Sequence, residues 1–144
     1  MKFSGLLILM AGVIVPVGVL GVPETVTGPI SARVLRVIDG DTIVVRARIW
    51  LGQDIDTQVR LDGVDAPELK GKCVQERLLA EKARDLIRFH VATGVVVLRK
   101  IKYGKYAGRV VARVDSTDGE ELSQLLIRAG LGRAYDGGRR LPWC

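Results

Sequence analysis

The sequence predicts an α+β fold in which two helices pack on a small five-stranded barrel, preceded by an N-terminal signal or anchor segment. Three observations predict this fold. The chain has 144 residues, enough for one domain with its own core and a short leader. Five short segments rich in Val and Ile are interspersed with two segments of helical periodicity. Hydrophobic residues make up 48% and charged residues 26%, which excludes a disordered or low-complexity chain.

The N-terminal segment reads as an export signal. Lys2 precedes an apolar run over residues 5–22, and small residues lie near the end of that run. This order of positive, apolar and small residues is typical of a cleaved signal peptide. The run is also close to the minimum length of a membrane-spanning helix, so an uncleaved N-terminal anchor is the alternative, and a buried core helix is a third interpretation. We therefore expect a secreted or periplasmic protein, or one anchored through residues 5–22 and facing outward.

The segment 23–31 contains two Pro and one Gly and is expected to be a linker, with the folded domain covering residues 32–144. Export would place Cys73 and Cys144 in an oxidising compartment, where they could form a disulfide. Two unpaired thiols are the alternative. Two Cys and one His are too few for a Cys/His zinc site, so a hydrolytic site here must use carboxylates, Arg, Lys or Tyr.

The first half of the domain is expected to contain three strands. Residues 33–38 and 42–50 are rich in Val and Ile and are separated by Asp-Gly-Asp. Residues 52–56 are expected to form a polar turn before the strand 58–61. In that strand, Val59 and Leu61 face one side and Arg60 faces the other.

The second half is expected to contain a loop, two helices and two more strands. The loop covers 64–72, the helices cover 76–91 and 120–129, and the strands cover 94–99 and 109–114. The first helix places Leu79, Ala83, Leu86 and Ile87 on one face. The second has Glu120 and Glu121 in its first turn, Leu122, Leu125, Leu126 and Ala129 facing inward, and Gly130 after its end.

Two acidic loops are the candidates for a metal site. Asp41 lies between the first two strands, and Asp65 and Glu68 follow the third. An Asp-Gly turn is by itself typical of a simple hairpin. If the barrel brings the loops together, however, the three carboxylates repel one another. A hard divalent cation such as Ca²⁺, which prefers oxygen ligands, would relieve that repulsion.

Two arginines could complete such a site. Arg60 lies on a rigid strand, and Arg109 begins the last strand directly after a Gly. Guanidinium groups in these positions could make forked contacts to phosphate. The net charge of +6, all of it within residues 33–144, is consistent with a polyanionic partner. We expect the remaining strand and helix arginines to be solvated, namely Arg46, Arg48, Arg99, Arg113 and Arg128.

Three motifs occur in order: VIDGDT (37–42), VRLDGVDAPE (59–68) and GRVVARV (108–114). With them the chain resembles the staphylococcal nuclease, or thermonuclease-like, family over about residues 33–136. The resemblance implies an OB-type five-stranded barrel and Ca²⁺-dependent hydrolysis of phosphodiester bonds in DNA and RNA, which leaves 3′-phosphates. It implies that Asp41 and Asp65 bind Ca²⁺ through their carboxylates and that Ala66 binds it through its backbone carbonyl. It also implies that Arg60 holds phosphate, that Glu68 is the general base, and that Arg109 stabilises the transition state. The alternative for Glu68 is that it only supports the metal ligands from outside and takes no proton.

The chain departs from the family pattern at one motif and at its C-terminal end. Ala107 precedes Gly108-Arg109 where the family often has Tyr, so Tyr103 or Tyr106 could replace that side chain in space, and Tyr135 matches a family position near the groove only loosely. Lys105, in Tyr-Gly-Lys, is a rival to Arg109, which we favour because a strand follows it at once. In the tail 135–144, Arg139, Arg140 and Trp143 could contact nucleic acid. Alternatively, Trp143 packing and Cys144 hold the tail against the domain.

The favoured hypothesis is an exported, monomeric Ca²⁺-dependent endonuclease. The main alternative is a nucleic-acid-binding OB domain without catalysis, since a fold does not determine a function. A third hypothesis is an envelope protein that uses the barrel for protein contacts. Retention of Asp41, Arg60, Asp65, Glu68 and Arg109 favours the enzyme, because a degenerate binding module is expected to lose such residues.

Overall fold

A computed structural model describes residues 24–144 of the chain. The expected signal or anchor at residues 1–22 lies outside the described residues. Within residues 24–144, no helix combines the length and the apolar character needed to cross a membrane.

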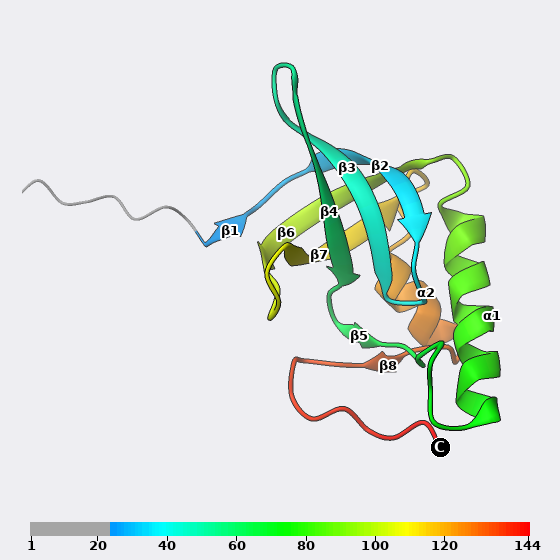
Figure 1. Ribbon diagram of the computed structural model, residues 1–144. Coiled ribbons are helices and arrows are strands. Elements are labelled where there is room, and N and C mark those ends of the chain that lie inside the picture. The colour runs from blue at the N-terminus through cyan, green and yellow to red at the C-terminus, as the bar shows by residue number, and fades with distance from the viewer. Residues whose placement is uncertain (1–23) are drawn as a thin grey trace, which may run out of the picture.

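A closed barrel of five strands forms the body of the molecule (Figure 1). Around the barrel, each strand is hydrogen-bonded to the next, and the last returns to the first. In that order the strands are β2 (Ile30–Val37), β3 (Thr42–Trp50), β4 (Gln53–Leu61), β7 (Arg109–Ser116) and β6 (Val95–Tyr103). All neighbours are antiparallel except β4 and β7, which run parallel. This order, together with the two helices, confirms the predicted α+β barrel of OB type.

Ordered structure begins before the expected start at Ala32. The short strand β1 (Thr25–Val26) pairs with β6, and Ile30 and Ser31 already belong to β2 and pair with the same strand. The expectation of a linker over 23–31 therefore fails for the residues that the structure describes. Gly28 and Pro29 lie in the short connection between β1 and β2.

The strands β3 and β4 form a long hairpin that projects from the barrel in Figure 1. The expectation of a polar turn over 52–56 was wrong, because β4 begins at Gln53 and the turn contains only Leu51 and Gly52. Gly52 adopts a positive φ of 72°, which glycine tolerates best. The polar residues Asp54 and Asp56 belong to the strand because they pair with Arg48 and Arg46 on β3.

The other arginines that we expected to be solvated also have acidic partners. Arg99 on β6 and Arg113 on β7 both pair with the carboxylate of Asp115, at 3.2 and 3.0 Å. Arg128 pairs with Glu120. These side chains are therefore surface ion pairs, although they remain partly open to solvent.

Both helices lie on the same side of the barrel (Figure 1). The first, α1 (Val74–His90), buries Ala83 and Ile87 in the core as its periodicity predicted. The second, α2 (Leu122–Arg128), is shorter than predicted, and Glu121 is its N-cap residue rather than part of its first turn. Ala129, predicted to face inward, is exposed. The core is continuous between barrel and helices, and its largest fully buried side chains include Ile43, Val59, Leu61, Ile87, Leu98, Leu122 and Leu126.

The C-terminal segment crosses beneath the barrel and ends beside the start of α1 (Figure 1). It contributes β8 (Arg133–Ala134), which pairs with β5 (Val64–Asp65) in a separate two-stranded sheet. Cys144 then forms a disulfide with Cys73, the N-cap residue of α1. The predicted disulfide is thus confirmed, and it attaches the tail to the element that follows the second acidic loop.

Candidate active site

Neighbouring strands bring the candidate residues together across β3, β4 and β7. Thr42 on β3 lies directly opposite Arg60 on β4, and Arg60 lies opposite Val111 on β7. Residues that are paired across strands point to the same face, and so do residues two apart along one strand. Arg60 and Arg109 therefore share a face, although 49 positions separate them in the sequence. Val59 and Leu61 point the other way, into the core, as predicted.

The loop between β2 and β3 carries Asp41 into a tight junction. Gly40 allows the close approach, because a Cβ atom there would lie 2.7 Å from the Cβ of Ala83 and 3.0 Å from that of Ala66. The Asp41 carboxylate is buried and accepts hydrogen bonds from the Thr42 hydroxyl (2.9 Å) and the Ala66 amide (3.0 Å). Arg60 lies 3.2 Å from it. Asp41 thereby joins the first acidic loop to the second.

The second acidic loop is held by Arg60 and by the first turn of α1. Arg60 donates to the carbonyl of Val64 at 3.1 Å, and its guanidinium lies 3.7 Å from the Asp65 carboxylate. The side chain of Glu76, itself buried, accepts hydrogen bonds from the amides of Glu68 (3.2 Å) and Lys72 (3.1 Å). Sequence reasoning placed Glu76 only at a helix start and missed this role. Its position three residues after the N-cap residue was the available signal.

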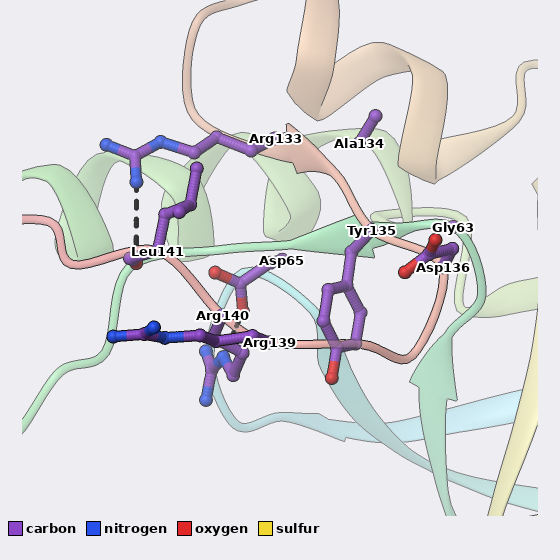
Figure 2. A pocket seen from close by; sticks show the side chains of 9 residues that line it. All are labelled: Gly63, Asp65, Arg133, Ala134, Tyr135, Asp136, Arg139, Arg140 and Leu141. Carbon is purple, nitrogen blue, oxygen red and sulfur yellow. Dashed lines mark hydrogen bonds and ion pairs between the residues drawn. The ribbon is translucent and has the colours of Figure 1, made fainter.

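Four of the predicted site residues line one cavity of about 380 Å³: Asp41, Arg60, Glu68 and Arg109. Asp65 instead lines a neighbouring cavity of about 390 Å³, drawn in Figure 2. Ala66 is buried between the acidic loops and lines neither. Besides these four residues, the lining of the first cavity includes Asp39, Thr42, Lys105, Tyr106, Tyr135 and Arg140.

Arg140 lies between the two cavities and lines both. Its guanidinium pairs with the Asp65 carboxylate, lies 2.8 Å from the Glu68 carboxylate and donates to the Ala66 carbonyl at 3.3 Å. Figure 2 shows this side chain next to Asp65, in the segment that crosses over β5. Nothing near Arg140 in the sequence signals this contact, since it depends on how the tail folds back.

The carboxylates do not form one compact cluster. In the part of the chain that the structure describes, the group of three potential ligands within 4.8 Å of one another is Cys73, Glu76 and Cys144, whose cysteines are disulfide-bonded. Asp41, Asp65 and Glu68 are instead separated by guanidinium groups, with Arg60 between the two aspartates and Arg140 between Asp65 and Glu68. The two acidic loops therefore lie close together, but positive side chains of the protein separate their carboxylates.

Asp39, the first acidic residue of the Asp-Gly-Asp turn, has the most perturbed acidity in the cavity. Burial, together with the nearby carboxylates of Asp41 and Glu68, raises the pKa of Asp39 from 3.8 to about 6. Nothing in the sequence distinguishes Asp39 from an ordinary turn residue. A perturbed carboxyl group in a charged cleft is a common property of functional sites.

The two cations proposed as rivals both line the cavity. Lys105 and Arg109 lie at opposite ends of the turn between β6 and β7, where the Gly104 amide donates to the Arg109 carbonyl at 2.9 Å. Tyr106 also lines this cavity, whereas Tyr103 is exposed elsewhere, so of these two tyrosines Tyr106 is the one placed to replace the missing tyrosine of the motif. The ring of Tyr135 lies 5.3 Å from the Arg60 guanidinium.

Comparison with known proteins assigns this arrangement to a family. Residues 58–140 match the family described as staphylococcal nuclease homologue. The chain belongs to this family. The match begins at β4 and includes Arg60, the second acidic loop, Arg109 and Arg140, while Asp41 lies before it.

Two relatives share the name "Uncharacterized endonuclease". This chain is 31% identical to the relative from Escherichia coli over 107 residues, which are 74% of this chain. The relative from Escherichia coli O157:H7 matches with the same identity and coverage. The chain spans about 62% of the length of these relatives.

Proposed function

We propose that this protein is an exported Ca²⁺-dependent nuclease that hydrolyses phosphodiester bonds of DNA and RNA and leaves 3′-phosphate ends. One observation carries the proposal. Two carboxylates and two guanidinium groups from three separate parts of the sequence, Asp41, Arg60, Glu68 and Arg109, line a single cavity of about 380 Å³. Membership of the nuclease-homologue family supports the reaction class.

The residues around the cavity fit a hard divalent cation. Asp41 and Asp65 offer carboxylate oxygens and Ala66 offers its carbonyl oxygen, which are ligand types that Ca²⁺ prefers. The oxygens of Asp65, Ala66 and Glu68 already surround one positive group, the guanidinium of Arg140. We infer that Asp41, Asp65 and Ala66 hold the ion, with Glu68 beside it.

The residues of the chain have separate tasks in this reaction. Arg60, buried between two aspartates, and Arg109, at the cavity wall, donate hydrogen bonds to the phosphate oxygens and offset the charge that grows there. Glu68, whose amide is fixed by Glu76, orients a water molecule and accepts its proton as the water attacks phosphorus. The bond to the 5′-oxygen breaks and leaves the phosphate on the 3′ side. Bound Ca²⁺ would supply further positive charge that lowers the repulsion between the anionic phosphate and the nucleophile.

The proposal of export rests on the apolar run of residues 5–22 and is consistent with the disulfide, since such bonds persist in oxidising compartments. A secreted or periplasmic location is proposed, with an anchor through residues 5–22 as the alternative. The mass of the mature chain from its host distinguishes the two: a mass that lacks the first two dozen residues or so indicates cleavage. Size-exclusion chromatography with light scattering tests the proposed monomer.

A cleavage assay tests the activity. The full chain is incubated with end-labelled single-stranded DNA or RNA, in Ca²⁺ or in chelator, and product ends are treated with phosphatase. We expect Ca²⁺-dependent cleavage with phosphatase-sensitive 3′ ends, reduced in Glu68→Gln by about 100-fold or more. Glu81→Gln, a change of the same kind on the exposed face of α1, should keep full activity. Binding without cleavage under every metal tested would contradict the proposal and favour a non-catalytic OB domain.

A further inference from the structure

The guanidinium of Arg140 contacts the same oxygen atoms that the proposed metal site would use. It pairs with Asp65 and Glu68 and donates to the carbonyl of Ala66. Two cations that share one small set of oxygens repel each other, so each weakens the binding of the other. We propose that Arg140 competes with the metal ion for this site, and that the Cys73–Cys144 disulfide strengthens the competition by holding the tail in place. This inference rests on the proposed metal site and names how that site is regulated.

The covalent connection between Arg140 and the acidic loop is short. Cys73 follows Glu68 by five residues, and Arg140 precedes Cys144 by four. The disulfide and the Arg140–Glu68 ion pair therefore close a small ring at the entrance to α1. A short tether gives the tethered group a high effective concentration at its partner, which falls when the tether is cut.

A second side chain of the tail takes the other oxygen of Asp65. The indole N–H of Trp143 donates to Asp65 Oδ2 at 3.3 Å, while Arg140 pairs with Oδ1. Trp143 is itself held by Arg133 of β8, whose guanidinium lies 3.8 Å from the centre of the indole ring and which donates to the Pro142 carbonyl at 3.0 Å. Both carboxylate oxygens of Asp65 are therefore contacted by the tail, and a metal ion bound there would compete with at least one of these contacts.

The energies are compatible with a reversible competition. The Arg140 side chain is 41% exposed, and Glu68 is similarly open to solvent. The Arg140–Glu68 pair, open to solvent on both sides, is therefore weak, whereas Asp65 is only 4% exposed and its pair with Arg140 is the main contact that a divalent cation must replace. Because coupling between two binding events is reciprocal, removal of Arg140 must raise metal affinity to the extent that metal binding releases Arg140.

Metal binding measured directly tests the inference without reference to catalysis. Calcium titration calorimetry is performed on the full chain in wild type, Arg140→Gln, Cys144→Ser and Arg139→Gln. We expect the dissociation constant for Ca²⁺ to fall about tenfold in Arg140→Gln, within the usual range of coupled sites, and by less in Cys144→Ser. Arg139→Gln removes the same charge from the neighbouring residue, which among the described residues makes no hydrogen bond or ion pair with Asp65, Ala66 or Glu68, and should leave the affinity nearly unchanged.

Trp143 gives a second signal. The chain has two Trp, and Trp50 at the tip of the β3–β4 hairpin is 68% exposed, so Trp50→Phe leaves Trp143 as the only indole. Addition of Ca²⁺ should shift the Trp143 emission to longer wavelength as the indole leaves Asp65. Thermal melting of each variant verifies that it is folded.

The outcomes separate this inference from the proposed function. Equal or weaker Ca²⁺ binding in folded Arg140→Gln would overturn the competition but leave the metal site intact. Absence of Ca²⁺ binding in every variant would show that the proposed metal site itself is wrong, and the competition would fall with it.

Discussion

Oδ2 of Asp41 lies 3.2 Å from the guanidinium of Arg60, and both side chains are almost fully enclosed. The pair connects the turn before β3 with the middle of the site, because the same guanidinium also contacts Asp65 and the Val64 carbonyl. A largely enclosed guanidinium with this many partners determines where both acidic loops lie. Its replacement should therefore affect stability as well as chemistry.

Arg60→Gln is expected to lower the free energy of unfolding by about 3 kcal/mol, since it leaves the buried Asp41 carboxylate without its cation and removes one of the two cations beside Asp65. Urea unfolding in chelator measures the change. Arg48→Gln is the matched control, because Arg48 pairs with Asp54 on the exposed hairpin and should cost less than about 1 kcal/mol. Equal losses in the two variants would contradict a special role for the Arg60 network.

Gly40→Ala should destabilise the protein by about 1–3 kcal/mol, because its Cβ would clash with Ala83 on α1 and Ala66 in the second acidic loop. The loop must then retreat and carry Asp41 away from the Ala66 amide, so Ca²⁺ affinity should fall as well. The double variant Gly40→Ala, Ala83→Gly returns the lost space. Recovery of part of the stability, measured as a double-mutant cycle, is the expected result, and strict additivity would disprove the clash.

The stability of the metal-free protein should depend on the protonation of Asp39. Its pKa is about 6 in the folded protein, above the ordinary value of 3.8, so the folded state binds this proton more tightly than the unfolded chain does. This contribution is complete below about pH 4 and is lost as the pH rises through about 6, to a total of at most about 3 kcal/mol.

Urea unfolding at pH 5 and pH 7.5, in wild type and in Asp39→Asn, measures this dependence. The wild type should lose more stability between the two pH values than the variant, since all other titrating groups are common to both. Parallel profiles would mean that Asp39 titrates as it does in an unfolded chain.

Arg109 and Lys105 can be distinguished by their kinetic effects. Arg109→Ala is expected to lower kcat by about 100-fold or more, because it removes a forked donor aimed at the developing charge. Lys105→Ala should lower kcat by less than about tenfold and mainly raise KM, as expected for a point charge that attracts the substrate. Arg88→Ala, on the exposed face of α1, controls for the loss of one positive charge. A larger effect on kcat at Lys105 would show that the motif was aligned wrongly.

The disulfide should contribute strongly to stability. The bonded cysteines are 71 residues apart, and closing a loop of that length stabilises a protein by about 4 kcal/mol in the chain-entropy model. Urea unfolding with and without reductant, compared with the Cys73→Ser, Cys144→Ser double variant, measures it. Reduced protein as stable as oxidised protein would indicate that the tail contributes little to the folded domain.

Much of the fold was predictable because the signals were local. The alternation of Val59, Arg60 and Leu61 predicted which side chains face the core, and the helical spacing of Ala83 and Ile87 predicted the buried face of α1. The first half of β4 was missed because Asp54 and Asp56 resemble turn residues until their partners across the hairpin are known. Strand membership there is decided by pairing, not by composition.

The candidate site was predictable in its membership but not in its internal arrangement. The motifs indicated that Asp41, Arg60, Glu68 and Arg109 belong together, and they line one cavity. Arg140 was foreseen only as a nucleic-acid contact, because its approach to Glu68 spans 72 residues and depends on how the tail folds back. Glu76 was missed for a related reason. Its side chain accepts hydrogen bonds from amides of a loop, and the sequence does not specify the course of that loop.

The order of the chain also determines when the tail can be tethered. Every strand of the barrel and both helices precede Cys144, so the ribosome completes the whole domain before this cysteine emerges. In a newly made chain the tail is therefore untethered until an oxidant reaches both thiols. The disulfide can form only after every strand of the barrel and both helices have been synthesised.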